Sequence, residues 1–316
     1  MRVIVVAKIR VNKQRFYFEL GESTLAYTLY RREPSIVSST NTESKPKSES
    51  NPKRIVLLHG AGVAGELTWA FIANYLKCWD EILVPDLLGM GESYHEESDK
   101  LGFTIADICG SLFSLFRHHQ WFEFDLVGYS LGGLVALELN REAKLELGNV
   151  SRPDFLIRKL GLIEPALFSD QSLQAALSFR QSFIPIAANI KLNPDVDEHF
   201  IDFLDLVSPK RKRSLQMDKM AVGRLKKRPY GFANALAAVS HYAEQLDEYK
   251  LDSLIAAIPT GIGIVGGLSN PGLLQAQQKI RLQQSKWQIE VLANTDHSLV
   301  YVRPKIIAKL LNEHLS

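Results

Sequence analysis

The sequence predicts an α/β fold in which helices cover both faces of a parallel β-sheet. Three observations support this prediction. Short, almost uninterrupted apolar runs recur along the chain, as expected for strands that are buried on both faces. Segments with apolar residues at helical spacing separate these runs. A Gly-x-Ser-x-Gly pentapeptide at 128–132 joins one such run to the helical segment after it.

The N-terminal part of the chain predicts β-structure. The apolar run at 1–8 is too short for a secretory signal and is interpreted as a first strand. We expect β-rich segments at about 3–11 and 16–30, with Gly21 as a turn within the second. Residues 35–53 hold almost no apolar side chains and predict a flexible polar loop.

From residue 54 onward, predicted strands and helices alternate. The strands are 55–58, 82–84, 124–127, 160–163, 262–265 and 287–292, and the helices are 68–76, 105–118, 131–147, 273–282 and 304–315. Between 168 and 251 the sequence is mainly helical. Such an insert is expected to be a lid over the carboxyl edge of the sheet, where ligands bind. The predicted domains are therefore a core of 1–165 and 252–316 and a lid of 166–251.

Composition excludes several classes of protein. The chain has 316 residues, 46% hydrophobic and 23% charged, which is ordinary for a soluble globular protein. A net charge of +2 argues against a dedicated nucleic-acid binder. Cys78 and Cys109 lie in apolar segments expected to be helical, which indicates buried thiols. No stretch approaches the roughly 18 apolar residues of a membrane helix, so we expect a cytoplasmic protein without an integral membrane segment.

Ser130 is the candidate nucleophile. It is the serine of the pentapeptide, between the strand 124–127 and the helix 131–147. A serine on this sharp turn is held in a strained backbone conformation that exposes its hydroxyl at the sheet edge. Gly128 and Gly132 are expected because a Cβ atom at either position would collide with the neighbouring strand or helix.

His297 is the candidate base among eight histidines. It follows the strand 287–292, in a loop expected at the same sheet edge as Ser130. His118 and His119 end a predicted helix, where interaction with the helix dipole is sufficient to explain them. For His199 and His241, in the predicted lid, a role in the pocket stays open.

The segment His59-Gly60-Ala61-Gly62 follows the strand 55–58, also at the carboxyl edge. We expect the amides of Ala61 and Leu131 to bind the oxyanion of an acyl-transfer intermediate. A phosphate-binding loop is a weak alternative, because the chain lacks the Gly-x-x-x-x-Gly-Lys-Ser/Thr pattern. Asp86, after the strand 82–84, is interpreted as a structural residue that binds loop amides.

These motifs resemble the α/β-hydrolase superfamily. The resemblance rests on His59-Gly60 after a strand, on Pro85-Asp86-x-x-Gly89-x-Gly91-x-Ser93, on Gly128-x-Ser130-x-Gly132-Gly133, and on Asp296-His297 before the last helix. It implies an eight-stranded, mostly parallel sheet with a lid inserted after the sixth strand. It also implies a Ser–acid–His triad in that chain order.

The acid departs from the usual pattern of the superfamily. The stretch 266–271, where an aspartate is expected, contains Asn270 instead. Glu164 ends the strand 160–163, the position that supplies the acid in many haloalkane dehalogenases. A buried glutamate requires a partner, and the His297 ring would serve. We therefore favour Glu164, while Asn270 and Asp296 stay open as alternatives.

The predicted function is a serine hydrolase that cleaves an ester or related acyl bond through Ser130, His297 and Glu164. A C–C bond hydrolase, a thioesterase or an acyltransferase would use the same residues, and an inactive ligand-binding protein is the remaining alternative. A serine nucleophile argues against dehalogenase or epoxide-hydrolase chemistry. We expect no metal or organic cofactor and a small, largely apolar acyl substrate.

Two basic clusters, at 210–213 and 226–228, lie in the predicted lid. We expect a solvated helix face, with an anion-attracting patch as the alternative. The sequence does not predict the oligomeric state.

Overall fold

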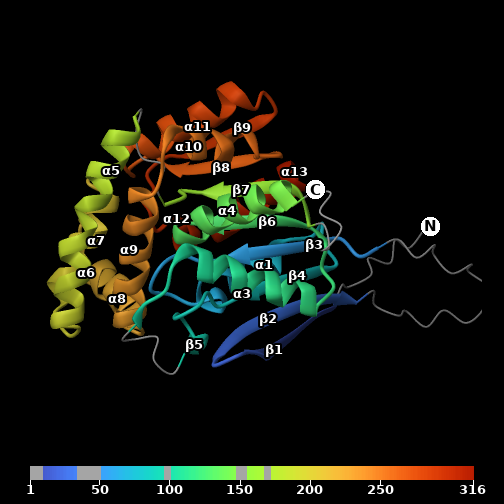
Figure 1. The fold of residues 1–316 in the computed structure, drawn as a ribbon, viewed down its shortest axis with the longest axis horizontal. Coiled ribbons are helices and arrows are strands. Elements are labelled where there is room, and N and C mark those ends of the chain that lie inside the picture. Colours follow the sequence, from blue (N-terminus) through green and yellow to red (C-terminus); the bar gives the residue numbers. More distant parts are fainter. Residues whose placement is uncertain (1–9, 34–50, 96–100, 147–154, 167–171) are drawn as a thin grey trace, which may run out of the picture.

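The computed structural model describes residues 10–33, 51–95, 101–146, 155–166 and 172–316 (Figure 1). The predicted strand at 1–8 and nearly all of the polar loop at 35–53 lie outside these ranges. At the centre is a nine-stranded sheet, and eight of its strands follow one another in the order β1-β2-β4-β3-β6-β7-β8-β9. Their bounds are Arg10–Leu20, Ser23–Glu33, Glu81–Pro85, Arg54–Leu58, Glu123–Tyr129, Leu156–Ile163, Thr260–Gly266 and Trp287–Leu292.

Pairing in the sheet is parallel from β4 through β9 and antiparallel for β1–β2 and β2–β4. The two-residue strand β5, Tyr94–His95, pairs with β2. The predicted α/β-hydrolase fold, with a mostly parallel sheet of eight main strands flanked by helices, is thus confirmed.

The N-terminal strands form a hairpin whose boundary differs from the prediction. β1 pairs with β2 from Arg10↔Glu33 to Leu20↔Ser23, so the first strand continues through the break expected after residue 11. Gly21 lies between the strands and not within one, and its φ of +61° is the left-handed conformation that a tight hairpin requires. The boundary between β1 and β2 is determined by the pairing of the two strands, which the local composition does not reveal.

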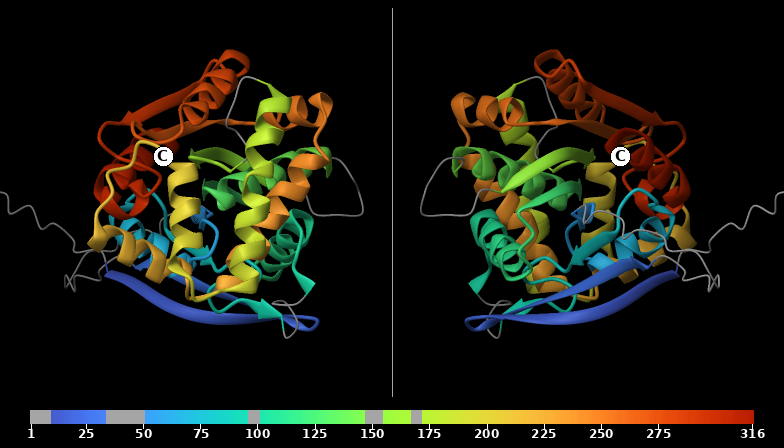
Figure 2. Two further views of the ribbon diagram at one scale, coloured as in Figure 1. Left: turned by 90° about the vertical axis from the view of Figure 1, so that its left-hand side faces the viewer. Right: turned by 90° about the vertical axis from the view of Figure 1, so that its right-hand side faces the viewer.

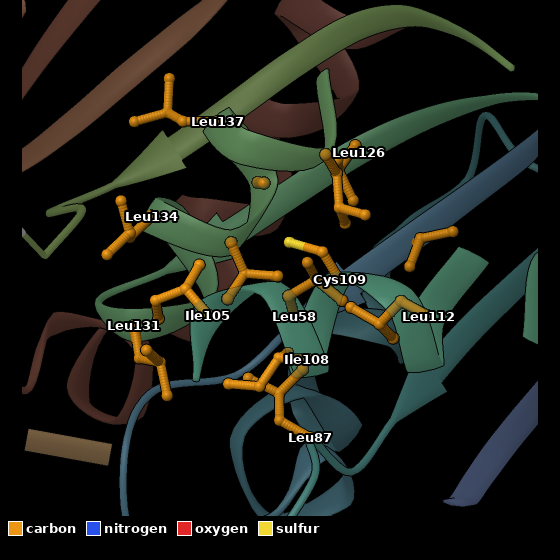
Figure 3. Packing of buried hydrophobic residues seen from close by; sticks show 14 of the residues in the cluster. Leu58, Leu87, Ile105, Ile108, Cys109, Leu112, Leu126, Leu131, Leu134 and Leu137 are labelled. Carbon is orange, nitrogen blue, oxygen red and sulfur yellow. The ribbon is translucent and has the colours of Figure 1, made fainter. Parts of the chain in front are cut away.

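Side-chain alternation along the strands builds a core on each face of the sheet. On one face, Val56 and Leu58 of β3 pack with α3 (Ile105–His118) and α4 (Leu131–Glu146), as Figure 3 shows around Leu58. On the other face, Ile55 and Leu57 pack with α1 (Gly65–Tyr75) and α13 (Pro304–Leu315). Further described helices next to the sheet are α10 (Glu248–Ala256), α11 (Pro271–Gln283) and α12 (Leu299–Val302).

The two cysteines lie in different settings. Cys109 is buried in α3, as predicted. Cys78 is only half-buried and follows α1, so its predicted helical setting is wrong. The helix ends at Tyr75 because Leu76 adopts an extended conformation, with ψ of 122°.

Between residues 172 and 251, where the structure describes most of the predicted lid, five helices follow β7. They are α5 (Leu173–Gln181), α6 (Phe183–Leu192), α7 (Asp197–Val207), α8 (Leu215–Leu225) and α9 (Pro229–Glu244). Figure 1 shows them at the end of the sheet toward which the parallel strands run, and Figure 2 (left) looks directly onto them. They share a separate apolar core, in which the Phe203 and Phe232 rings meet at 4.9 Å between centroids. Val63, from the loop after β3, packs into that core.

Within the described ranges, no helix combines the length and apolar character that a membrane crossing requires. The cytoplasmic location stays a prediction.

Candidate active site

Ser130 lies on the turn between β6 and α4 with φ of +54°. Non-glycine residues rarely adopt this left-handed region, and such strain persists only where neighbouring structure enforces it. The Ser130 amide donates to the carbonyl of Ile163 at 3.0 Å, and its carbonyl accepts from the Ala166 amide at 2.8 Å. The end of β7 therefore holds the serine turn in place.

The glycines of the pentapeptide are required by close contacts. A Cβ atom on Gly128 would lie 2.1 Å from the carbonyl oxygen of Gly132. A Cβ atom on Gly132 would lie 2.4 Å from the carbonyl oxygen of Leu58. Both contacts are with backbone atoms that cannot move aside, so the predicted steric reason for these glycines is confirmed.

The His297 ring lies between two of the predicted site residues. Its Nε2 is 3.0 Å from the Ser130 hydroxyl, and its Nδ1 is 2.5 Å from a carboxylate oxygen of Glu164. The loop after β9 carries the ring, and two contacts fix this loop. The Tyr129 hydroxyl donates to the His297 carbonyl at 2.6 Å, and the His297 amide donates to the Ser208 hydroxyl at 3.0 Å.

Glu164 is fully buried at the end of β7 and has φ of +45°. One carboxylate oxygen faces His297, and the other accepts from the Gly266 amide at 2.6 Å. A buried carboxylate is costly unless hydrogen bonds or an opposite charge compensate for lost water. Here the imidazole and the amide of the neighbouring strand β8 provide that compensation.

The two alternatives to Glu164 have other partners. The Asn270 side chain caps α11 by accepting from the Gly272 amide at 2.9 Å. The Asp296 carboxylate accepts from the Ser298 amide at 2.9 Å. The structure therefore brings Ser130, His297 and Glu164 together and gives Asn270 and Asp296 local structural roles.

Ala61 and Leu131, whose amides are the predicted oxyanion donors, border the same cavity as Ser130. Leu131 is the first residue of α4, where an amide has no carbonyl partner within its own helix. Ala61 follows β3 and precedes Gly62, whose φ of +71° turns the loop. Both residues line a small cavity together with Ser130 and His297. Their role with an oxyanion stays a prediction.

Two cavities meet at Ser130 and His297. The larger, about 190 Å³, lies against α7 and α8 and mixes apolar side chains such as Leu204 and Leu225 with the charged Arg211 and Arg224. The smaller, about 40 Å³, extends toward α5 and α9. Its lining residues are Ala61, Ser130, Leu131, Glu164, Pro165, Ala166, Phe179, Arg180, Phe203, Val207, Ala235, Leu236, Val239, Asn270, Leu273 and His297.

Ion pairs neutralise parts of the basic clusters. Arg211 pairs with Asp205 at 2.7 Å and with Asp218, and Arg213 also pairs with Asp205. In the second cluster, Lys226 pairs with Asp197 at 2.7 Å. Acidic side chains of the helical insert thus neutralise part of the positive charge of both clusters. Only the rest of that charge is available to attract anions.

The two histidines of the predicted lid are not part of the described site. In the described part of the chain, neither His199 nor His241 lines either cavity next to Ser130. Sequence reasoning also missed Tyr129 and Ser208, which fix the His297 loop. Tyr129 occupies the variable position of the pentapeptide and Ser208 lies in the insert, so neither carries a motif signal.

Asp86 and His59 form hydrogen bonds that hold the loops after β3 and β4 in place. Asp86 accepts from the amides of Gly65 at 2.7 Å and Glu92 at 2.9 Å, which confirms its structural interpretation. His59 is fully buried, with Nδ1 2.7 Å from the Gly60 carbonyl and Nε2 accepting from the Leu87 amide at 2.8 Å. This pattern requires a neutral ring, with its proton on Nδ1.

We expect His59 to make the fold sensitive to acid. Burial lowers its pKa below the ordinary 6.5. The neutral ring therefore stabilises the fold fully above pH 6.5, and this stabilisation is lost as the pH falls through the lower pKa of the folded state. The free energy of unfolding should fall by up to about 1.4 kcal/mol per pH unit in this window.

Urea unfolding between pH 7.5 and 5 measures this effect. His59→Gln should flatten the dependence of the unfolding free energy on pH, whereas His241→Gln, on an exposed side chain, should leave it unchanged. Equal slopes for the wild type and His59→Gln would contradict the assignment.

Solved structures of other proteins share the fold of this chain. Among solved structures, a putative lipase from Acinetobacter baumannii AYE superposes with a TM-score of 0.67 at 13% identity, covering 94% of this chain and 89% of its own. A carboxylesterase structure from Nitrososphaera gargenis gives 0.64 at 15% identity, with 93% and 96% covered. A thermophilic esterase from Thermogutta terrifontis gives 0.64 at 18% identity, with 95% and 97% covered.

At these identities, the similar structures show the fold alone. A search of curated protein sequences finds no match. The model of the alpha/beta hydrolase family matches residues 55–310, which include Ser130, Glu164 and His297. The chain therefore belongs to the α/β-hydrolase family.

Proposed function

We propose that this protein is a serine hydrolase that cleaves a carboxylic ester. The observation that carries the proposal is the continuous hydrogen-bond chain from the Ser130 hydroxyl through the His297 ring to the Glu164 carboxylate. A nucleophile, a base and a group that orients the base are the components that acyl transfer requires. The esterases and the lipase among the similar structures support the same reaction class.

In the proposed mechanism, Ser130 attacks the ester carbonyl while His297 Nε2 accepts its proton. Glu164 keeps the other ring proton on Nδ1 and stabilises the imidazolium as it forms. The Ala61 and Leu131 amides bind the oxyanion, and each such donor lowers the barrier by about 3 kcal/mol. The imidazolium then protonates the leaving alcohol, and His297 activates the water that hydrolyses the acyl-enzyme.

In this proposal, helices α5–α9 form the lid, and their side chains complete both cavities next to Ser130. Phe203 and Val207 of α7 contribute to both. A cavity of about 190 Å³ suits a small ester rather than a long-chain lipid or a polymer.

A fluorophosphonate probe tests the proposal directly. It labels a serine only where a base and oxyanion donors activate that serine. We expect stoichiometric labelling of the folded wild type at Ser130, detected by intact mass and peptide mapping. Ser130→Ala should not label, while Ser111→Ala, which removes a buried serine hydroxyl of α3, should label like the wild type. A folded wild type that resists the probe would support an inactive, ligand-binding protein instead.

A further inference from the structure

The Arg180 side chain is buried without an anionic partner. Arg180 lies in the last turn of α5 and is only 8% exposed. Within the described ranges, its guanidinium forms no ion pair, and its buried Nε has no hydrogen-bond partner. Arg211, a half-buried arginine of the same insert, pairs with both Asp205 and Asp218. The more deeply buried Arg180 has no such partner among the described residues.

Two aromatic rings hold the Arg180 guanidinium in place. Its central carbon lies 4.8 Å from the ring centroid of Phe183 and 5.5 Å from that of Phe179. Cation–π contacts stabilise the charge but leave the N–H groups without acceptors. Burial lowers the pKa of Arg180 to about 10, so the group is still charged at neutral pH.

Arg180 borders the smaller cavity, the one that also reaches Ser130 and His297. The other polar side chains of this cavity are already used: Glu164 binds His297, and Asn270 caps α11. A buried, unpaired cation that borders a cavity creates a strong requirement for an anion. A guanidinium with free N–H groups matches a carboxylate in both shape and charge.

We propose that the substrate is an ester that also carries a carboxylate, and that Arg180 binds this carboxylate in the smaller cavity. The volume of about 40 Å³ admits a small group and excludes a long alkyl chain. The ester carbonyl then lies at Ser130, and the remainder of the substrate extends into the larger cavity. This inference rests on the proposed esterase function and specifies its substrate class.

Matched pairs of esters test the proposal. The monoethyl esters of succinate, glutarate and adipate are compared with ethyl butyrate, pentanoate and hexanoate, in which a methyl group replaces the carboxylate. Hydrolysis is followed by proton release in a pH-stat. For at least one chain length, we expect the wild type to have a higher kcat/KM for the anionic ester than for its neutral partner.

Variants then assign this preference to Arg180. Arg180→Met should lower the ratio of anionic to neutral kcat/KM by about 10²–10³-fold, as expected for a lost buried charge pair. Arg180→Lys should keep part of the preference, because it retains the charge but not the planar fork. Arg213→Met, on an arginine whose side chain is 66% exposed, is the matched control and should leave the ratio unchanged.

Asp170 provides a second control, because it is close to Arg180 in the sequence and lies outside the described residues. We expect Asp170→Asn to keep the wild-type ratio. A wild type without preference, in which Asp170→Asn creates one, would overturn the proposal in favour of an internal ion pair.

The outcomes separate this inference from the proposed function. Hydrolysis of neutral esters and labelling by the probe, without a preference for anionic esters at any length, would overturn the inference alone. Absence of both labelling and hydrolysis would overturn the proposed function. If Arg180→Met does not fold, the wild type and Arg180→Lys still test the proposal. The assignment is contradicted if the wild type prefers the neutral esters and Arg180→Lys has the same ratio of anionic to neutral kcat/KM as the wild type.

Discussion

Replacing Ser130 by alanine is expected to lower kcat by about 10⁶-fold, the loss seen when a serine hydrolase loses its nucleophile. The hydroxyl 3.0 Å from His297 Nε2 is the only part of Ser130 that the substitution removes. Its backbone bonds to Ile163 and Ala166 involve the amide and the carbonyl, so the turn should persist. Steady-state hydrolysis of a chromogenic ester measures the loss.

The thermal unfolding midpoint of Ser130→Ala should stay within a few degrees of the wild-type value, since no buried packing is lost. Ser111→Ala serves as the control for removing a buried hydroxyl that borders neither cavity next to Ser130, and it should keep wild-type kcat. Activity of Ser130→Ala within tenfold of the wild type would show that another residue is the nucleophile.

Glu164→Gln should lower kcat by about 10⁴-fold, as in a triad whose acid becomes an amide. The glutamine keeps the shape of the side chain and an oxygen that accepts from the Gly266 amide. Its NH₂ group would then face His297 Nδ1 and favour the tautomer in which Nε2 carries the proton. Such a ring cannot accept the proton of Ser130, so the chemical step should slow while substrate binding changes little.

Asn270→Ala is the informative comparison, because Asn270 occupies the position where the superfamily usually has its acid. This variant removes the cap of α11, which should cost about 1 kcal/mol of folding free energy. Its kcat should stay within a few fold of the wild-type value. Separate measurements of kcat and of urea unfolding distinguish the two effects. A large loss of kcat in Asn270→Ala and a small one in Glu164→Gln would reverse the assignment.

The local sequence predicted the bounds of those elements whose ends are marked by capping or turn residues. The helix α3 begins and ends as predicted, because Thr104 and Asp107 form a capping box at its start. The bounds of β9 and α13 also agree with the prediction. The boundary between β1 and β2 was wrong because it depends on pairing between strands.

For the site, the sequence predicted the loops but only part of the contacts. Ser130 and His297 follow strands that end at one edge of the sheet, so topology places them at the same edge. Because β7 and β8 separate β6 from β9, their contact also depends on the path of the loop after β9, which topology does not fix. Choosing among Glu164, Asn270 and Asp296 required side-chain directions, which spacing does not provide. The sequence also could not predict that Arg180 lacks an anionic partner among the described residues. That property depends on the positions of carboxylates in the folded chain, which spacing does not provide.

The location of Glu164 directly after β7, and not after β8, has a consequence for adaptability. The loop after β8 carries no reacting group, yet its Asn270 and the nearby Leu273 form a wall of the smaller cavity. Substitution of these two side chains would remodel the pocket. Changes at Gly267 or Leu268 would instead reach the loop of His297, because their amides donate to the carbonyls of Leu292 and Thr295. Selectivity can therefore be engineered, or drift, at Asn270 and Leu273 as long as the segment before them is retained.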